Sequence, residues 1–215
     1  MSSFLEILKQ KKCKFIEIFF LFIVAPVVLL LPISIIIKVI YVGLGVVYIT
    51  LISIFKEKFS KIKTDKKSNK KVVLEIGIRF LIIALLTTLV LYYQNKEQLF
   101  NVILNKPDLW LKFSGVYILF SVIPQELIYR TFFVKRYQNL IKNKWLFIFI
   151  NSVLFSFAHI WFQSFTVLAF SFVGSLLFAH TYLKTKSNWL IILEHSIYGV
   201  CLYTVGYGEL FMFPV

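Results

Sequence analysis

The sequence predicts an all-α membrane protein, a polytopic helical bundle with about seven transmembrane helices. Hydrophobic residues make up 59% of the 215 residues, more than the roughly 45–50% of an ordinary soluble domain. The mean hydropathy is +0.82. The apolar residues also gather in long runs, and a helix of about 20 apolar residues spans the core of a bilayer.

Seven runs are long enough to be spans: residues 15–34, 36–55, 72–93, 113–133, 145–161, 165–183 and 189–207. Pro26, Pro32 and Lys38 interrupt the first two runs. These two therefore predict either a tight hairpin or one span with a re-entrant piece. We expect a single domain overall. Residues 1–71 would form N-terminal helices and a lysine-rich cytoplasmic loop (56–71), and residues 72–215 would form the membrane core.

The positive charges indicate the topology and the partner. The chain has 24 Lys and Arg against 10 Asp and Glu, a net charge of +14. Most lie in residues 9–14, 56–71, 134–144 and 184–186, between apolar runs. Cytoplasmic loops are rich in Lys and Arg, so we expect a multi-pass protein with its N-terminus cytoplasmic and its C-terminus outside. This distribution favours contact with anionic lipid over nucleic acid, for which we expect no binding.

Glu126 and Arg130 stand out because they lie inside an apolar run, in PQELIYRTFF. A charge at mid-membrane costs about 3 kcal/mol or more, so such residues face the protein interior and indicate function. The spacing of four places both side chains on one helix face, where each neutralises the other. A purely structural clasp is the alternative, and we expect the pair Glu75 and Arg79 to be one.

Two histidines join Glu126 as candidates. His159 ends the stretch FSFAH, and His195 follows Glu194 in LIILEHSIYG; His180 is expected to be structural. A helical bundle can direct side chains from three spans at one cavity. His159, His195 and Glu126 could then hold a zinc ion with an open water position. Without metal, the carboxylate could take a proton from water while an imidazole stabilises the oxyanion.

Both arrangements hydrolyse an amide, and the residues leave open whether zinc or no cofactor is used. The HExxH motif, which carries the zinc in one type of intramembrane protease, is absent from the sequence. That type is therefore excluded.

Three short motifs resemble those of the CPBP family, the CAAX-protease and bacteriocin-processing (Abi) intramembrane proteases. QELIYR resembles the family's EExxxR, FSFAH its FxxxH, and EHSIYG stands where the family has HxxxN or HxxxD. The match covers about residues 113–208 and makes residues 72–215 a CPBP-like core. It implies an intramembrane endopeptidase, related to type II CAAX prenyl endopeptidases, that cuts a peptide or a membrane-tethered protein near the cytoplasmic side.

The resemblance also implies catalytic roles for Glu126, His159 and His195, with Arg130 holding Glu126. Gln125 stands where the family's motif has its first glutamate, and Gly199 where it has Asn or Asp. The base must therefore be Glu126, or Glu194 must supply a second carboxylate. The alternative is a catalytically inactive membrane scaffold, or a bacteriocin-immunity-type protein, built on the same fold.

Overall fold

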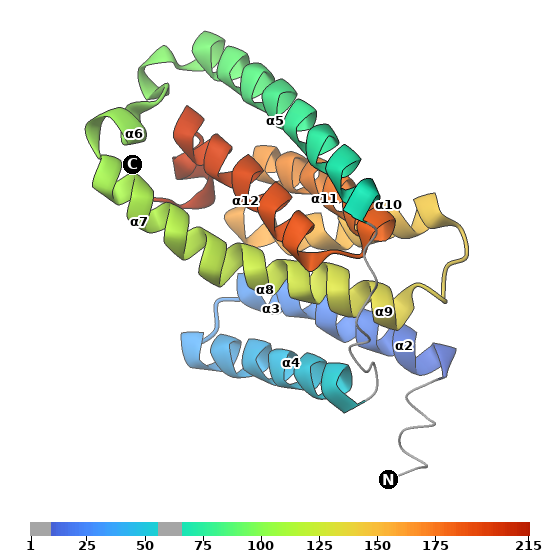
Figure 1. Ribbon diagram of the computed structural model, residues 1–215. Coiled ribbons are helices and arrows are strands. Elements are labelled where there is room, and N and C mark those ends of the chain that lie inside the picture. The colour runs from blue at the N-terminus through green and yellow to red at the C-terminus, as the bar shows by residue number, and fades with distance from the viewer. Residues whose placement is uncertain (1–9, 56–65) are drawn as a thin grey trace. The chain divides into compact units, whose positions relative to one another are not determined.

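The computed structural model describes residues 10–55 and 66–215, and every regular element within them is a helix (Figure 1). Among these residues, six helical segments are long and apolar enough to cross a membrane: Lys11–Leu30, Ile35–Ser53, Lys70–Gln94, Pro107–Tyr137, Lys144–Phe162 and Phe165–Thr185. The predicted class, an all-α polytopic membrane protein, is confirmed.

The seventh predicted span, residues 189–207, also forms a helix, α12 (Asn188–Val205), but α12 is not among those six. It carries Glu194 and His195, and both side chains are buried. Polar side chains in a membrane helix are tolerated where they face protein, so these two residues are compatible with a crossing by α12.

The chain divides into two compact units. The described residues of unit 1 lie within Met1–Lys61 and Thr131–Leu176, and those of unit 2 lie within Ile62–Arg130 and Leu177–Val215. Of the predicted lysine-rich loop, residues 56–65 lie outside the described part of the chain. Residues from Lys66 onward are helical and begin α5 (Lys66–Gln94), so this end of the loop is shorter than predicted.

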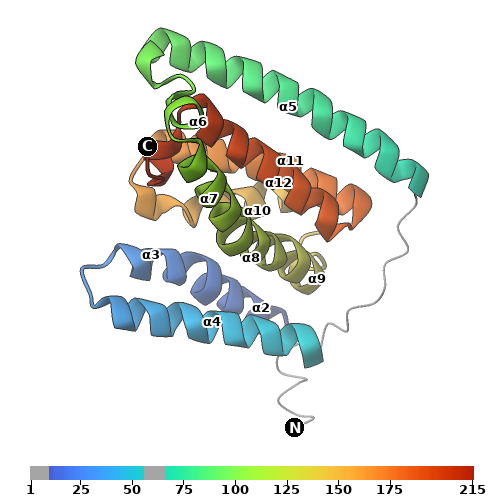
Figure 2. The same ribbon diagram turned by 60° about the vertical axis from the view of Figure 1, so that its left-hand side comes forward.

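Unit 1 begins with a helical hairpin. Its first arm consists of α2 (Lys11–Ile18), the π-helical η1 (Phe19–Val24) and α3 (Ala25–Leu30), and its second arm is α4 (Ile35–Phe55). The arms lie side by side (Figure 2), and the Tyr41 hydroxyl donates to the Phe20 carbonyl at 3.1 Å. Both arms are long enough to span a bilayer, which favours the hairpin over the re-entrant piece.

The rest of unit 1 comprises α9 (Phe133–Tyr137), α10 (Lys144–Phe157), η5 (Ile160–Phe162) and the start of α11 (Phe165–Thr185). Phe22 packs edge-on against Phe133, with ring centroids 5.1 Å apart. Arg136 makes two hydrogen bonds to the buried Glu17, at 3.0 and 2.8 Å. The hairpin is therefore joined to α9 by both an aromatic contact and an ion pair.

Unit 2 contains α5, η2 (Lys96–Gln98), α6 (Asn101–Asn105), α7 (Pro107–Tyr117), η3 (Ile118–Val122), α8 (Ile123–Glu126), most of η4 (Leu127–Phe132), the end of α11, α12 and η6 (Gly208–Phe211). In both views α5 runs along α12 (Figures 1 and 2). A core of Val72, Ile76, Phe178, Leu190 and Tyr198 joins α5, α11 and α12.

Two prolines explain why two of the long helices contain π-helical turns. Pro26 follows η1 by two residues, and Pro124 follows η3 by two residues. A proline has no N–H to donate, and its ring clashes with the carbonyl four residues earlier. A widened turn before the proline relieves that clash and lets the helix continue. In the second case Glu126 lies in the same short helix as Pro124, two residues after it.

Candidate active site

The Glu126–Arg130 pair predicted from the sequence is present and fully buried. Glu126 ends α8 and Arg130 lies one turn later in η4, and both side chains are 0% exposed. Nε of Arg130 lies 3.4 Å from Oε2 of Glu126. The guanidinium thus offsets the charge of a carboxylate that no solvent reaches.

His195 binds the other oxygen of the same carboxylate. Its Nδ1 lies 2.8 Å from Oε1 of Glu126, and because a carboxylate oxygen only accepts, Nδ1 is the donor. In a neutral ring this leaves the lone pair on Nε2. The Phe178 ring stacks on the imidazole with centroids 4.5 Å apart and 22° between planes. The contacts with Glu126 and Phe178 together fix both the tautomer and the orientation of His195.

The carboxylate of Glu126 is therefore held asymmetrically. Oε1 accepts the hydrogen bond from His195, whereas Oε2 is buried with no hydrogen-bond partner among the described residues. Nε of Arg130 lies at ion-pair distance from Oε2. An oxygen in this state can accept a proton from a water molecule, which is the task of a general base.

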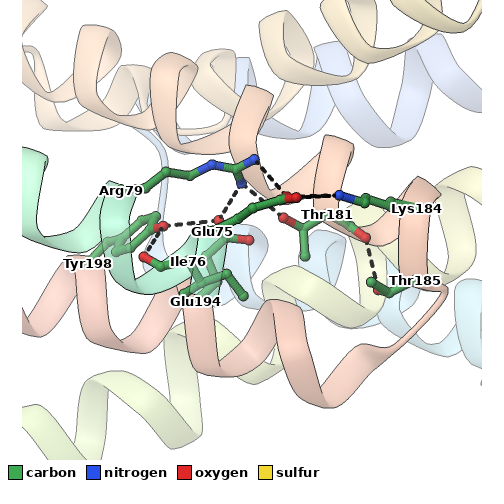
Figure 3. A network of polar contacts seen from close by, with 8 residues as sticks. All are labelled: Glu75, Ile76, Arg79, Thr181, Lys184, Thr185, Glu194 and Tyr198. Atoms are coloured by element: carbon green, nitrogen blue, oxygen red, sulfur yellow. Dashed lines mark hydrogen bonds and ion pairs between the residues drawn. The ribbon is translucent and has the colours of Figure 1, made fainter. Parts of the chain in front are cut away.

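Glu194 lies in a different polar network, shown in Figure 3. Its Oε1 accepts from Nη1 of Arg79 and from the hydroxyl of Tyr198, both at 3.1 Å. Arg79 also donates to Thr181 at 3.3 Å. Successive residues on a helix point about 100° apart. Glu194 therefore faces α5, while its neighbour His195 faces Glu126.

The expected clasp between Glu75 and Arg79 exists but is the weaker interaction of Arg79. Their closest atoms are 3.7 Å apart, whereas Glu75 receives two hydrogen bonds from Lys184, at 2.6 and 2.9 Å. Arg79 also forms an ion pair with Glu194, which was not predicted from the sequence. The signal was available, because Arg79 and Glu194 are both charged residues within apolar runs.

His159 belongs to unit 1, where it lies between the end of α10 and the start of η5. Its Nδ1 donates to the Phe155 carbonyl at 2.8 Å, as a histidine at a helix terminus does, and its ring stacks on Phe162 with centroids 6.0 Å apart. In a neutral ring the lone pair is again on Nε2. That His159 acts together with Glu126 and His195 stays a prediction of the sequence.

The structure shows the surroundings of Gln125 and Gly199, the two residues that depart from the family motif. The amide of Gln125 donates to the Ser121 hydroxyl at 2.9 Å, so it turns back along its own helix. Gly199 lies beside the Tyr117 side chain, and a Cβ at this position would come within 2.5 Å of Cε1 and Cζ of that ring. Tyr117, which carries a hydroxyl within the uncharged stretch FSGVYILF, was also not predicted from the sequence.

The donor set of unit 2 does not fit a zinc ion. A catalytic zinc site needs three protein ligands and an open position. Among the described residues, no three His, Cys, Asp or Glu side chains gather as metal ligands. Both oxygens of Glu126 also face cationic or hydrogen-donating groups. The residues of unit 2 therefore favour a reaction without a metal-dependent step.

Fold and site together define a multi-pass helical membrane protein with a buried carboxylate–imidazole pair inside it. Residues 107–201 match the profile of a family described as Rce1-like, type II CAAX prenyl endopeptidase. This part of the chain is accordingly similar to Rce1-like domains of the CPBP group, the family whose motifs the sequence resembles. Searches of curated proteins and of solved structures gave no significant match.

Proposed function

We propose that this protein is an intramembrane endopeptidase that hydrolyses a peptide bond of a membrane-associated peptide or protein. One observation carries the proposal: Glu126 is completely buried, is fixed through Oε1 by His195, and has an Oε2 without a hydrogen-bond partner among the described residues. Keeping a buried carboxylate is costly unless it is paired and hydrogen-bonded, and the contact of Glu126 with the imidazole of His195 makes it a candidate catalytic acid or base.

The reaction follows from the two oxygens of Glu126. Oε2 removes a proton from a water molecule, and the water oxygen attacks the carbonyl carbon of the scissile peptide bond. A tetrahedral intermediate with a negative oxygen forms. When it collapses, the C–N bond breaks and the leaving nitrogen takes the proton back from Glu126. The products are a carboxylate and an amine, and Glu126 is regenerated.

The other residues orient the carboxylate of Glu126 and the water molecule, and they stabilise the charge of the base. His195 holds the carboxylate through Nδ1, and its Nε2 side is suited to positioning the water. Arg130 keeps a compensating positive charge next to the base. From the resemblance we assign His159 a role in the same reaction, and Glu194 a supporting role as a second carboxylate next to His195.

The substrate class rests on the family profile and on the apolar surroundings. The matching family is described as type II CAAX prenyl endopeptidases, so a lipid-bearing C-terminal peptide is one suitable substrate. A bilayer-embedded site selects substrates that partition into the membrane. We therefore expect a lipid-tethered or membrane-spanning peptide to be cleaved in preference to a soluble one.

The test is cleavage by the purified full chain in lipid nanodiscs. The probes are a fluorogenic farnesylated CAAX peptide, the same peptide without the lipid, and a mixture of membrane-protein peptides read by mass spectrometry. Glu126→Gln removes the base while conserving shape, so we expect kcat to fall at least about 10²-fold. His195→Ala and His159→Ala are expected to have losses of similar size.

Matched controls are Glu75→Gln and His180→Ala, which we expect to leave kcat within about twofold of the wild type. Full activity of Glu126→Gln would remove Glu126 from the mechanism. A wild type that cleaves none of the probes would favour the inactive scaffold or immunity-type alternative. Repeating the assay with 1,10-phenanthroline tests for zinc, and we expect cleavage to persist.

A further inference from the structure

Gly199 and Tyr117 form a complementary pair next to the candidate active site. Gly199 lies in α12 one turn after His195, and Tyr117 ends α7. The space that a Cβ of residue 199 would fill is taken by the Tyr117 ring and hydroxyl. Any larger residue at position 199 would displace this phenol, so the glycine is what admits it.

The phenol contacts His195 directly. The Tyr117 and His195 rings meet edge to face, with centroids 6.0 Å apart and an angle of 81°. On another side, Phe213 packs against Tyr117 with centroids 5.5 Å apart. Tyr117 is held by these two rings, and its hydroxyl has no hydrogen-bond partner among the described residues. An O–H of this kind next to a reaction centre is available to a bound molecule.

We propose that Tyr117 is a catalytic residue whose hydroxyl donates a hydrogen bond to the negative oxygen of the tetrahedral intermediate. This inference rests on the proposed peptidase function and adds a specific donor to it. Glu126 takes the proton of the attacking water, and the carbonyl oxygen gains negative charge as its C=O double bond opens. The Tyr117 O–H stabilises that charge without transferring its proton. The hydrogen bond weakens when the C–N bond breaks and the carbonyl re-forms.

The chemistry of the pair supports this role over simple packing. A donor fixed in place before the reaction stabilises developing charge more than a mobile water does, because little reorganisation is needed. A phenylalanine would fill the same space without the hydroxyl. Gly199 carries no side-chain donor, and the Tyr117 side chain, which does carry one, occupies the space beside it.

The first test is Tyr117→Phe in the nanodisc cleavage assay. The ring and its contacts remain, so we expect an unchanged melting temperature, little change in KM and a fall in kcat of about 10²-fold. Tyr203→Phe is the matched control, because the Tyr203 hydroxyl donates to the Pro214 carbonyl at 2.9 Å and has no part in the reaction. We expect it to retain the wild-type kcat.

The second test moves the donor. Gly199→Ala should reduce kcat by displacing the phenol. The double variant Tyr117→Ala/Gly199→Asn places an amide donor in the vacated space, and we expect it to be at least tenfold faster than Tyr117→Ala. Wild-type activity in Tyr117→Phe would overturn the role of Tyr117 and leave the peptidase proposal standing. A wild type without cleavage would overturn both.

Discussion

Glu126 and Glu194 are both fully buried, yet each is compensated differently. Glu126 has its arginine on the same helix four residues later, whereas Glu194 takes Arg79 from α5. Removing one partner of a buried ion pair leaves an uncompensated charge, which is more destabilising than removing both. Structural and catalytic roles of Glu126 can therefore be separated by measuring stability and activity in the same variants.

For the Glu126–Arg130 pair we expect Arg130→Leu to lower the free energy of unfolding by about 3–5 kcal/mol, because Glu126 then stays buried without its cation. The double variant Glu126→Leu/Arg130→Leu should recover most of this stability and have no peptidase activity. Denaturant unfolding in detergent micelles measures the first effect and the cleavage assay the second. A double variant as unstable as Arg130→Leu would contradict the ion-pair explanation.

Among the elements, α5 has a role that its position outside the matched region 107–201 does not suggest. It packs along α12 through Val72 and Ile76, and its Arg79 reaches Glu194, the neighbour of His195. Two kinds of contact with α5, apolar packing and an ion pair, thus constrain α12. This ion pair, made with a helix from the N-terminal half of the chain, fixes the rotation of α12 about its own axis and therefore the direction in which His195 points.

The consequence for α5 can be measured. Arg79→Leu should destabilise the protein by about 3 kcal/mol, since it leaves Glu194 buried without a cation. Glu75→Gln should cost less than about 1 kcal/mol, because the Glu75–Lys184 pair is exposed. Hydrogen exchange of α12 amides, followed by mass spectrometry, is expected to speed up in Arg79→Leu alone. Equal effects of the two substitutions would show that Arg79 does not fix α12.

Two π-helical segments, η3 and η4, interrupt the helix that carries Glu126. The sequence predicts one regular span over 113–133, whereas η3 and η4 flank the short α8 that ends in Glu126. Pro124 explains the first of these. No feature of the sequence pattern predicts η4, the π-helical segment that contains Arg130.

For the whole molecule, the positive segments between the apolar helices determine the expected topology. We expect seven crossings, the six apolar helices and α12, with the N-terminus inside and the C-terminus outside. Alkaline phosphatase fused after Val215 is then expected to be active, and a green fluorescent protein fused there dark. The reverse pattern would mean that α12 does not cross.

The sequence by itself determined the helical membrane class, the long apolar helices and the Glu126–Arg130 pair. These depend on local quantities: the length of an apolar run must match the bilayer, and a spacing of four places two side chains on one helix face. It also named Glu126, His159 and His195 as the residues suited to hydrolysis.

Only the tertiary structure decided which of these polar groups meet. His195 binds Glu126 across 69 positions, Arg79 binds Glu194 across 115, and Tyr117 fills the space that Gly199 leaves open. The rotation of one helix against another selects these contacts. That rotation is set by the packing of many side chains at once, such as those of the core around Phe178, and no spacing within a single helix encodes it.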